Sequence, residues 1–283
     1  RDIVEEPMTA SCPASYLQQH DNIAFYVDEN SASMLTRMVA PWLVGPCEWT
    51  PKFNPWNKYY IAINQATVFM DNVEKCPELT HEEQAQMKAE ARFLRAYFYF
   101  NLFKQYGPIF LWFDTTPDMK IKSEDIDRHT VDECVDFIES EMLKAAEDLP
   151  NEVADPTTWK GRITKGAALG MRSRVLLFAA RPLFNGGGKE GYGKDLVNYY
   201  GKHIFPQKED PSKWDKAAKA AKAVIDLNQY ALHETKEMIS DPVEKGMHSY
   251  REVFTEKWNE ELIFARYYPS GEVWNQRVVP PRV

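Results

Sequence analysis

Two helix starts of the same type constrain most strongly what this sequence can fold into. Thr80-His81-Glu82-Glu83 and Thr130-Val131-Asp132-Glu133 both have the capping-box pattern, in which a Thr and a Glu three residues later satisfy each other's backbone N–H groups. Apolar residues at helical spacing follow each box, over residues 85–103 and 131–149, and Gly107-Pro108 predicts the end of the first of these helices. A further helix beginning near Tyr59 precedes the first box, so a short turn joins two helices that must pack as a hairpin.

The same organisation recurs along the chain. We expect helix pairs near residues 59–106, 130–180 and 212–255, within a single domain that covers residues 1–283 and forms the N-terminal part of a longer chain. Large aromatic side chains alternate with alanine inside the pairs, as in tetratricopeptide packing. The predicted fold class is therefore mostly α, with tetratricopeptide-like helix pairs, long decorated loops and little β structure. Residues 261–268 are rich in apolar and aromatic side chains, and we expect them to form one short strand.

The most apolar helix also gives specific core predictions. Phe93, Leu94 and Phe100 lie on it, and we expect all three to be buried. On that basis, truncating Leu94 to alanine should cost about 2–5 kcal/mol of stability, the usual range for an emptied core position.

Charge and cysteine content exclude several classes of function. The chain has 42 acidic against 34 basic residues and a net charge of −8, whereas a nucleic-acid-binding protein or a polybasic membrane-surface helix needs a basic face. No apolar run approaches the roughly 18 residues of a membrane span. Cys12, Cys47, Cys76 and Cys134 contain no CxxC pair, so zinc is not indicated, and both free thiols and disulfides remain open.

No catalytic or cofactor motif is complete. The segment 188–195 approaches the GxxxxGK[ST] phosphate loop, but Asp195 stands at its last position, where it would repel phosphate, and a helix precedes it. The six histidines form no HExxH motif, no GxSxG elbow is present, and we find no acid pair suited to glycoside hydrolysis. The sequence predicts no enzyme, no metal and no cofactor, although the acids of loops 107–128 and 181–211 leave a structural calcium open.

The segment 42–58 is the best candidate for ligand binding. It contains three Trp, one Phe and three Pro, and prolines stiffen a loop so that it presents aromatic rings at little entropic cost. Sugar rings offer C–H faces to aromatic rings and hydroxyls to polar groups. The candidate ligand-binding residues are Trp49, Lys52, Asn54 and Trp56. The alternative is that these tryptophans only anchor the loop to the helices.

Residues 89–108 resemble the SusD/RagB family of nutrient-binding outer-membrane lipoproteins of Bacteroidetes. They contain a similar acid-Ala-Arg-Phe-Leu-Arg-Ala run, at residues 90–96, followed by aromatic residues and a terminal Gly-Pro. Residues 59–66, 161–177 and 214–232 resemble the family's other helices in order and spacing, so the resemblance spans about residues 15–270. Two features depart from the family: Arg1 is not the lipidated cysteine that begins its mature chains, and its members are longer.

The resemblance implies a non-enzymatic, lipid-anchored protein on the extracellular face of the outer membrane. Such a protein captures oligosaccharide and passes it to a SusC-like TonB-dependent transporter. The alternative function is a helical-repeat adaptor that binds protein or peptide without affinity for sugars. A glycan-cleaving enzyme on a helical scaffold is a third class, for which the sequence offers no acid pair.

Overall fold

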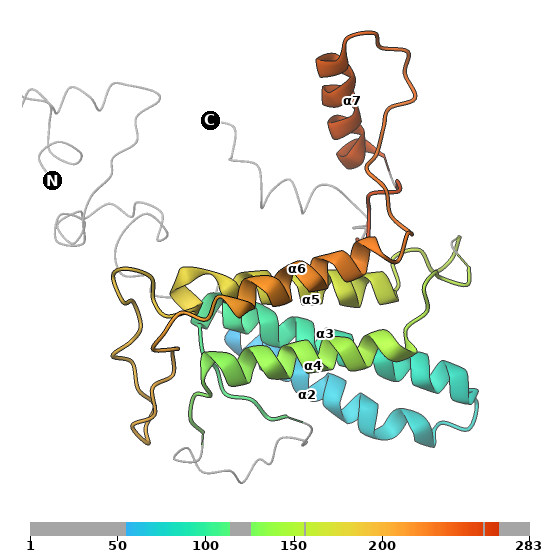
Figure 1. The fold of residues 1–283 in the computed structure, drawn as a ribbon. Helices are drawn as coiled ribbons and strands as arrows, with labels where there is room; N and C mark the ends of the chain where they lie inside the picture. Colours follow the sequence, from blue (N-terminus) through green and yellow to red (C-terminus); the bar gives the residue numbers. More distant parts are fainter. Residues whose placement is uncertain (1–54, 114–125, 156, 257, 266–283) are drawn as a thin grey trace, which may run out of the picture. The chain divides into compact units, whose positions relative to one another are not determined.

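A computed structural model of the chain describes residues 55–113, 126–155, 157–256 and 258–265 (Figure 1). All of the regular structure in these residues is helical, and the only β feature in this part of the chain is an isolated antiparallel bridge between Val197 and His203. The expected mostly α architecture is therefore confirmed. None of the described helices is both long enough and apolar enough to cross a membrane.

Five of the helices follow one another as packed neighbours. They are α2 (Trp56–Asn72), α3 (His81–Tyr106), α4 (Val131–Asp148), α5 (Lys165–Ala180) and α6 (Ser212–Ile225). Each packs against the next, so that α3, α4 and α5 lie between two helical neighbours (Figure 1). The remaining elements are α7 (Pro242–Thr255) and two short 3₁₀ helices, η2 (Val73–Lys75) and η4 (Pro182–Phe184).

The core lies between these helices and combines large aromatic rings with small alanine side chains. Phe93, Tyr99, Phe100 and Phe103 of α3 are completely or almost completely buried. Small residues of α4, α5 and α6 complete the contacts, including Ala145, Ala168 and Ala220. This alternation lets neighbouring helices approach closely.

Both predicted capping boxes are present. At the start of α3, the Glu83 N–H donates to Thr80 Oγ1 at 3.2 Å, and the Thr80 N–H donates to Glu83 Oε2 at 2.9 Å. Thr130 and Glu133 make the same reciprocal bonds at the start of α4. At the other end of α3, Gly107 has a φ of 69° and its N–H donates to Phe103 O at 2.9 Å, as the Gly-Pro signal predicts.

The core prediction for Leu94 was wrong. Phe93 and Phe100 are buried, but the Leu94 side chain is 36% exposed, because successive residues point about 100° apart around a helix. Truncating Leu94 therefore does not empty a core position, and the large stability cost predicted for it does not apply.

Three other features of the elements also differ from the expectation. The first helix of the described part begins at Trp56 rather than near Tyr59. Residues 261–265, the described part of the strand-like run, form turns and bends rather than a strand. Helix α6 packs against α5, whereas α7, which the sequence places in the third pair, has no buried residue.

The run at residues 90–96 that carries the family resemblance has a structural role. Arg95 and Glu141 form a fully buried ion pair between α3 and α4, with side chains 1% and 0% exposed. Arg92 reaches the same carboxylate at 3.0 Å from the edge of the core. Arg95 also donates to the carbonyl of Phe113 at 3.1 Å. These contacts hold the helices in register, so the signature marks the scaffold rather than a ligand site.

Glycines shape the loop that follows η4. Gly187 has a φ of 73°, and a Cβ there would lie 2.5 Å from the carbonyl oxygen of Tyr192, so only glycine fits. Residues 188–195, which approach the phosphate-loop motif, thus form a series of turns, as we expected from the sequence. Of the cysteines, Cys76 and Cys134 are free thiols, and burial raises the pKa of Cys134 to about 12.

Candidate functional site

Only one of the four predicted ligand-binding residues falls in the described part of the chain. Trp49, Lys52 and Asn54 lie outside it. Trp56 begins α2, where its half-buried ring lies 4.9 Å from the ring of Tyr60 and 4.8 Å, edge-on, from that of Tyr106. The ring therefore contributes to packing at the start of α2, which is the anchoring role that the sequence left open.

A cavity with aromatic residues in its lining lies where three segments meet: the loop between α4 and α5, the chain that follows α6, and the chain that follows α7. They enclose an open cavity of about 230 Å³. The principal residues that line it are Asn151, Arg162, Gln229, Tyr230, Trp258 and Asn259.

The positions of these side chains are set by contacts with the helical scaffold. Arg162 donates from Nε and Nη2 to the carboxylate of Glu90 on α3, at 2.9 and 3.0 Å, and such a two-point pair fixes the plane of a guanidinium group. Tyr230 passes directly over Gly166 of α5, where a Cβ would lie 1.9 Å from its hydroxyl oxygen. The absence of a side chain at Gly166 is thus what allows Tyr230 to reach the cavity.

The chemistry of the cavity suits a polar ligand with apolar faces. Trp258 is half-buried, and the Lys160 ammonium lies 5.2 Å from the centre of its ring. Gln229 contributes a buried side-chain oxygen that makes no hydrogen bond, and a buried acceptor of this kind is costly unless a ligand or water completes it. Aromatic faces next to amides and a guanidinium are the groups that a sugar ring and its hydroxyls require.

The sequence did not indicate this cavity. Tyr230 and Trp258 are separated by 27 residues, and neither belongs to a motif that indicates ligand binding. The nearest signal is the polar, proline-bearing loop before α5, which is longer than most helix–helix connections. Only the packing of α5 and α6 brings the segments together.

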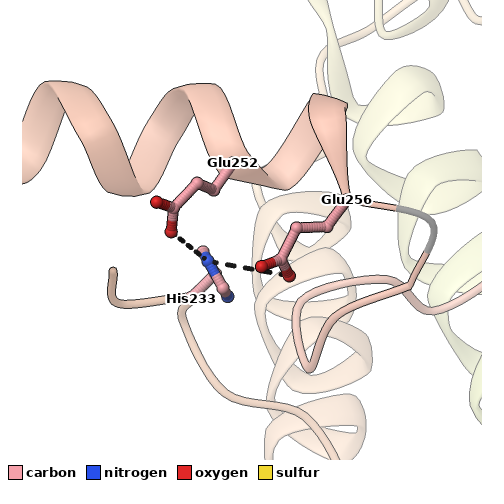
Figure 2. A group of neighbouring side chains, drawn as sticks. All are labelled: His233, Glu252 and Glu256. Atoms are coloured by element: carbon pink, nitrogen blue, oxygen red, sulfur yellow. Dashed lines mark hydrogen bonds and ion pairs between the residues drawn. The ribbon is translucent and has the colours of Figure 1, made fainter. Parts of the chain in front are cut away.

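A cluster of ionisable groups connects α7 to the segment before it (Figure 2). His233, whose side chain is 3% exposed, donates from Nε2 to the carboxylate of Glu252 at 3.0 Å, and the same nitrogen lies 4.0 Å from Glu256. Its Nδ1 lies 3.2 Å from Glu260. Thr235 donates to the second oxygen of Glu252 at 2.7 Å.

Electrostatics reinforce this cluster. The hydrogen bond to Glu252 raises the pKa of His233 above its ordinary value, with Glu260 adding to the effect. The hydrogen bond from Thr235, followed by that from His233, lowers the pKa of Glu252. In the sequence, His233 belongs to no histidine motif. The only sequence signal for the cluster is the i, i+4 spacing of Glu252 and Glu256, which places both carboxylates on one side of a helix.

Comparison with known proteins places these features in a family. Residues 9–177 match the SusD-like family described as "Starch-binding associating with outer membrane". A SusD-like protein of Bacteroides ovatus is 29% identical over 152 residues, which are 53% of this chain and 26% of that protein. The chain thus spans about a quarter of the length of this relative.

A solved structure supports the same family, whereas a shorter sequence match carries a different name. The structure of a SusD-like protein from Bacteroides fragilis is similar over 78% of this chain and 35% of its own, with 27% identity and a TM-score of 0.57. A Bacteroides thetaiotaomicron protein named as glucosamine-6-phosphate deaminase-like is 44% identical, but over only 52 residues, which are 18% of this chain and 8% of that protein.

Proposed function

This chain belongs to the SusD-like family, and from that premise we propose that it is a cell-surface protein that binds oligosaccharides. The observation that carries the proposal is the family match over residues 9–177, whose description names starch binding and the outer membrane. The helical scaffold agrees with that of the SusD-like structure from Bacteroides fragilis.

The proposed role is capture and delivery of a nutrient. The protein would be lipid-anchored at the extracellular face of the outer membrane and would pass its glycan to a SusC-like TonB-dependent transporter. It would do so without cleaving the glycan. The short match to a deaminase-like protein covers too little of either chain to support catalysis.

We propose two sets of residues for glycan contact. The first is the cavity beside Tyr230 and Trp258, where rings and amides converge. The second is the aromatic segment of the sequence prediction, represented by Trp49, Lys52, Asn54 and Trp56. Among these four, the ring contacts of Trp56 with Tyr60 and Tyr106 favour a supporting role.

The first test is a direct comparison of ligand classes. The chain would be applied to an array of plant, microbial and host oligosaccharides and, in parallel, to a peptide array. Binding to a restricted set of glycans supports the proposal. Binding to peptides alone would replace it with the helical-repeat adaptor function.

A second measurement addresses catalysis. The best-bound glycan would be incubated with the protein, and reducing ends would be counted over time. We expect no increase above the glycan alone. A steady increase that depends on protein concentration would indicate a glycan-cleaving enzyme and contradict the proposed role.

A further inference from the structure

The His233 cluster carries more negative charge than its own residues can neutralise. Glu252, Glu256 and Glu260 all lie within 4.0 Å of the ring nitrogens of His233, and one imidazole supplies at most a single positive charge. The neighbouring basic side chains are His248, close to Glu252, and Lys236, close to Glu260. Because His248 is itself paired with Glu237 at 2.9 Å, the cluster retains an excess of carboxylates.

The two nitrogens of the buried imidazole face different partners. Nε2 faces Glu252 and Glu256, whereas Nδ1 lies 3.2 Å from Glu260. Metal-binding histidines commonly have a carboxylate at the ring nitrogen that does not bind the metal, which orients the ring. Glu260 is placed to do this while Nε2 binds an ion.

The geometry suits a small divalent cation. Ligand atoms of His233, Glu252 and Glu256 all lie within 4.8 Å of one another. Zinc binds imidazole nitrogen and carboxylate oxygen at about 2.0–2.2 Å, so an ion between these atoms needs only small side-chain adjustments. Figure 2 shows both carboxylates, four residues apart at the end of α7, directed toward the imidazole.

The surroundings resemble those of protein metal ligands. A ligating carboxylate is commonly held by a hydrogen bond to its other oxygen. Thr235 holds Glu252 in this way, at 2.7 Å, and is itself held by Ser249, whose Oγ accepts from the Thr235 N–H at 3.0 Å. Glu256 is about half exposed, so the ion would have access from solvent.

We propose that His233, Glu252 and Glu256 form a binding site for a divalent transition-metal ion, with zinc as its best match. Imidazole nitrogen together with carboxylate oxygen favours zinc over calcium, which takes oxygen ligands only. The nitrogen that binds the metal must be unprotonated, so any proton on it is released to solvent. Water or a neighbouring carboxylate completes the coordination.

The site would give α7 a stability that packing does not provide. No residue of α7 is buried, and Val243, Met247, Tyr250 and Phe254 are each about 70% exposed. Isolated helices of this length are marginal in water. A metal that joins Glu252 and Glu256 to His233 would tie the end of α7 to the segment before it, independently of glycan binding.

The test measures zinc binding and helix protection in the same protein. Zinc chloride would be titrated calorimetrically into the full chain without a histidine tag, and amide hydrogen exchange in α7 would be followed with and without zinc. The test variant is Glu256→Gln, which removes one exposed ligand charge. The matched control is Glu244→Gln, with the same change in charge on the same helix.

We expect the wild-type chain and Glu244→Gln to bind zinc with equal affinity and to gain protection in α7. Glu256→Gln should bind at least about tenfold more weakly and gain no protection at the same zinc concentration. The proposal would be overturned if the wild-type chain bound no zinc or if both variants bound it with equal affinity. It would also be overturned if zinc bound without protecting α7, which is the result expected if the cysteine thiols were the ligands.

Discussion

Replacing Glu141 by glutamine tests the idea that the signature run is a structural device. The substitution keeps the size of the side chain and removes its charge. Arg95 would then remain buried, at 1% exposure, opposite a neutral partner. Arg92 and Lys144, at 3.0 and 3.3 Å from the carboxylate, would lose the same counter-charge.

The expected cost follows from the burial of Arg95. Removing one partner of a buried ion pair destabilises proteins by about 3–5 kcal/mol, because the remaining buried charge loses a counter-charge. The matched control is Glu139→Gln on the same helix, which breaks the pair with Arg172, whose side chains are 18% and 19% exposed. This pair is only part-buried, so water can solvate the charge that remains, and its loss should cost less than the loss of the fully buried pair.

Urea unfolding followed by far-ultraviolet circular dichroism measures both free energies. For a domain of this size, the loss at Glu141 corresponds to a decrease in melting temperature of roughly 6–20 °C, and the decrease in the control should be smaller. If Glu141→Gln were within 1 kcal/mol of Glu139→Gln, the claim that this pair holds α3 and α4 together would be refuted.

Three further predictions concern the cavity, the aromatic segment and pH. Gly166→Ala should weaken glycan binding, because the added Cβ would displace Tyr230. Gly170→Ala should not, because a Cβ there would lie 3.8 Å from the nearest atom. Equal affinities of the two variants in a glycan titration would argue against Tyr230 as a contact. Trp49→Ala should cost about 1–3 kcal/mol of binding, by analogy with bases stacked on aromatic rings, without a change in melting temperature; an unchanged affinity would remove Trp49 from the site. The hydrogen bond from Lys202, followed by that from the Thr130 backbone, lowers the pKa of Glu133 to about 2, so its contribution to stability is present above its ordinary pKa and is lost as the pH falls toward 2. The stability difference between wild type and Glu133→Gln in urea should therefore be larger at pH 6 than at pH 2.5, and a difference independent of pH would contradict this assignment.

The helical framework was readable from the sequence because its signals are local. A capping box needs only Thr80 and Glu83, and the end of α3 needs only Gly107. Phe93 was also predictable as a large aromatic on the most apolar helix. Leu94 was not, because α3 has apolar residues on more than one side and the periodicity does not state which sides face a neighbour.

The cavity and the ion cluster were not predictable because they depend on tertiary contacts. Tyr230 reaches the cavity only because Gly166 of another helix lacks a side chain. His233 meets Glu252 only because the chain between them doubles back, a path closed by the Ala231 N–H donating to Glu260 O at 3.2 Å. Apart from the i, i+4 spacing of Glu252 and Glu256, no local pattern in these segments indicates such a meeting.

The measurement that tests the proposed function most directly is a calorimetric titration of the best-bound oligosaccharide into the wild-type chain, Trp258→Ala and Trp214→Ala. Trp214 lies on α6, is 44% exposed and does not line the cavity, so it controls for the loss of a tryptophan. We predict saturable binding by the wild type and Trp214→Ala, with an affinity about 1–3 kcal/mol lower for Trp258→Ala. Failure of the wild-type chain to bind any oligosaccharide would contradict the proposed function, and equal affinity of all three proteins would contradict the cavity as its site.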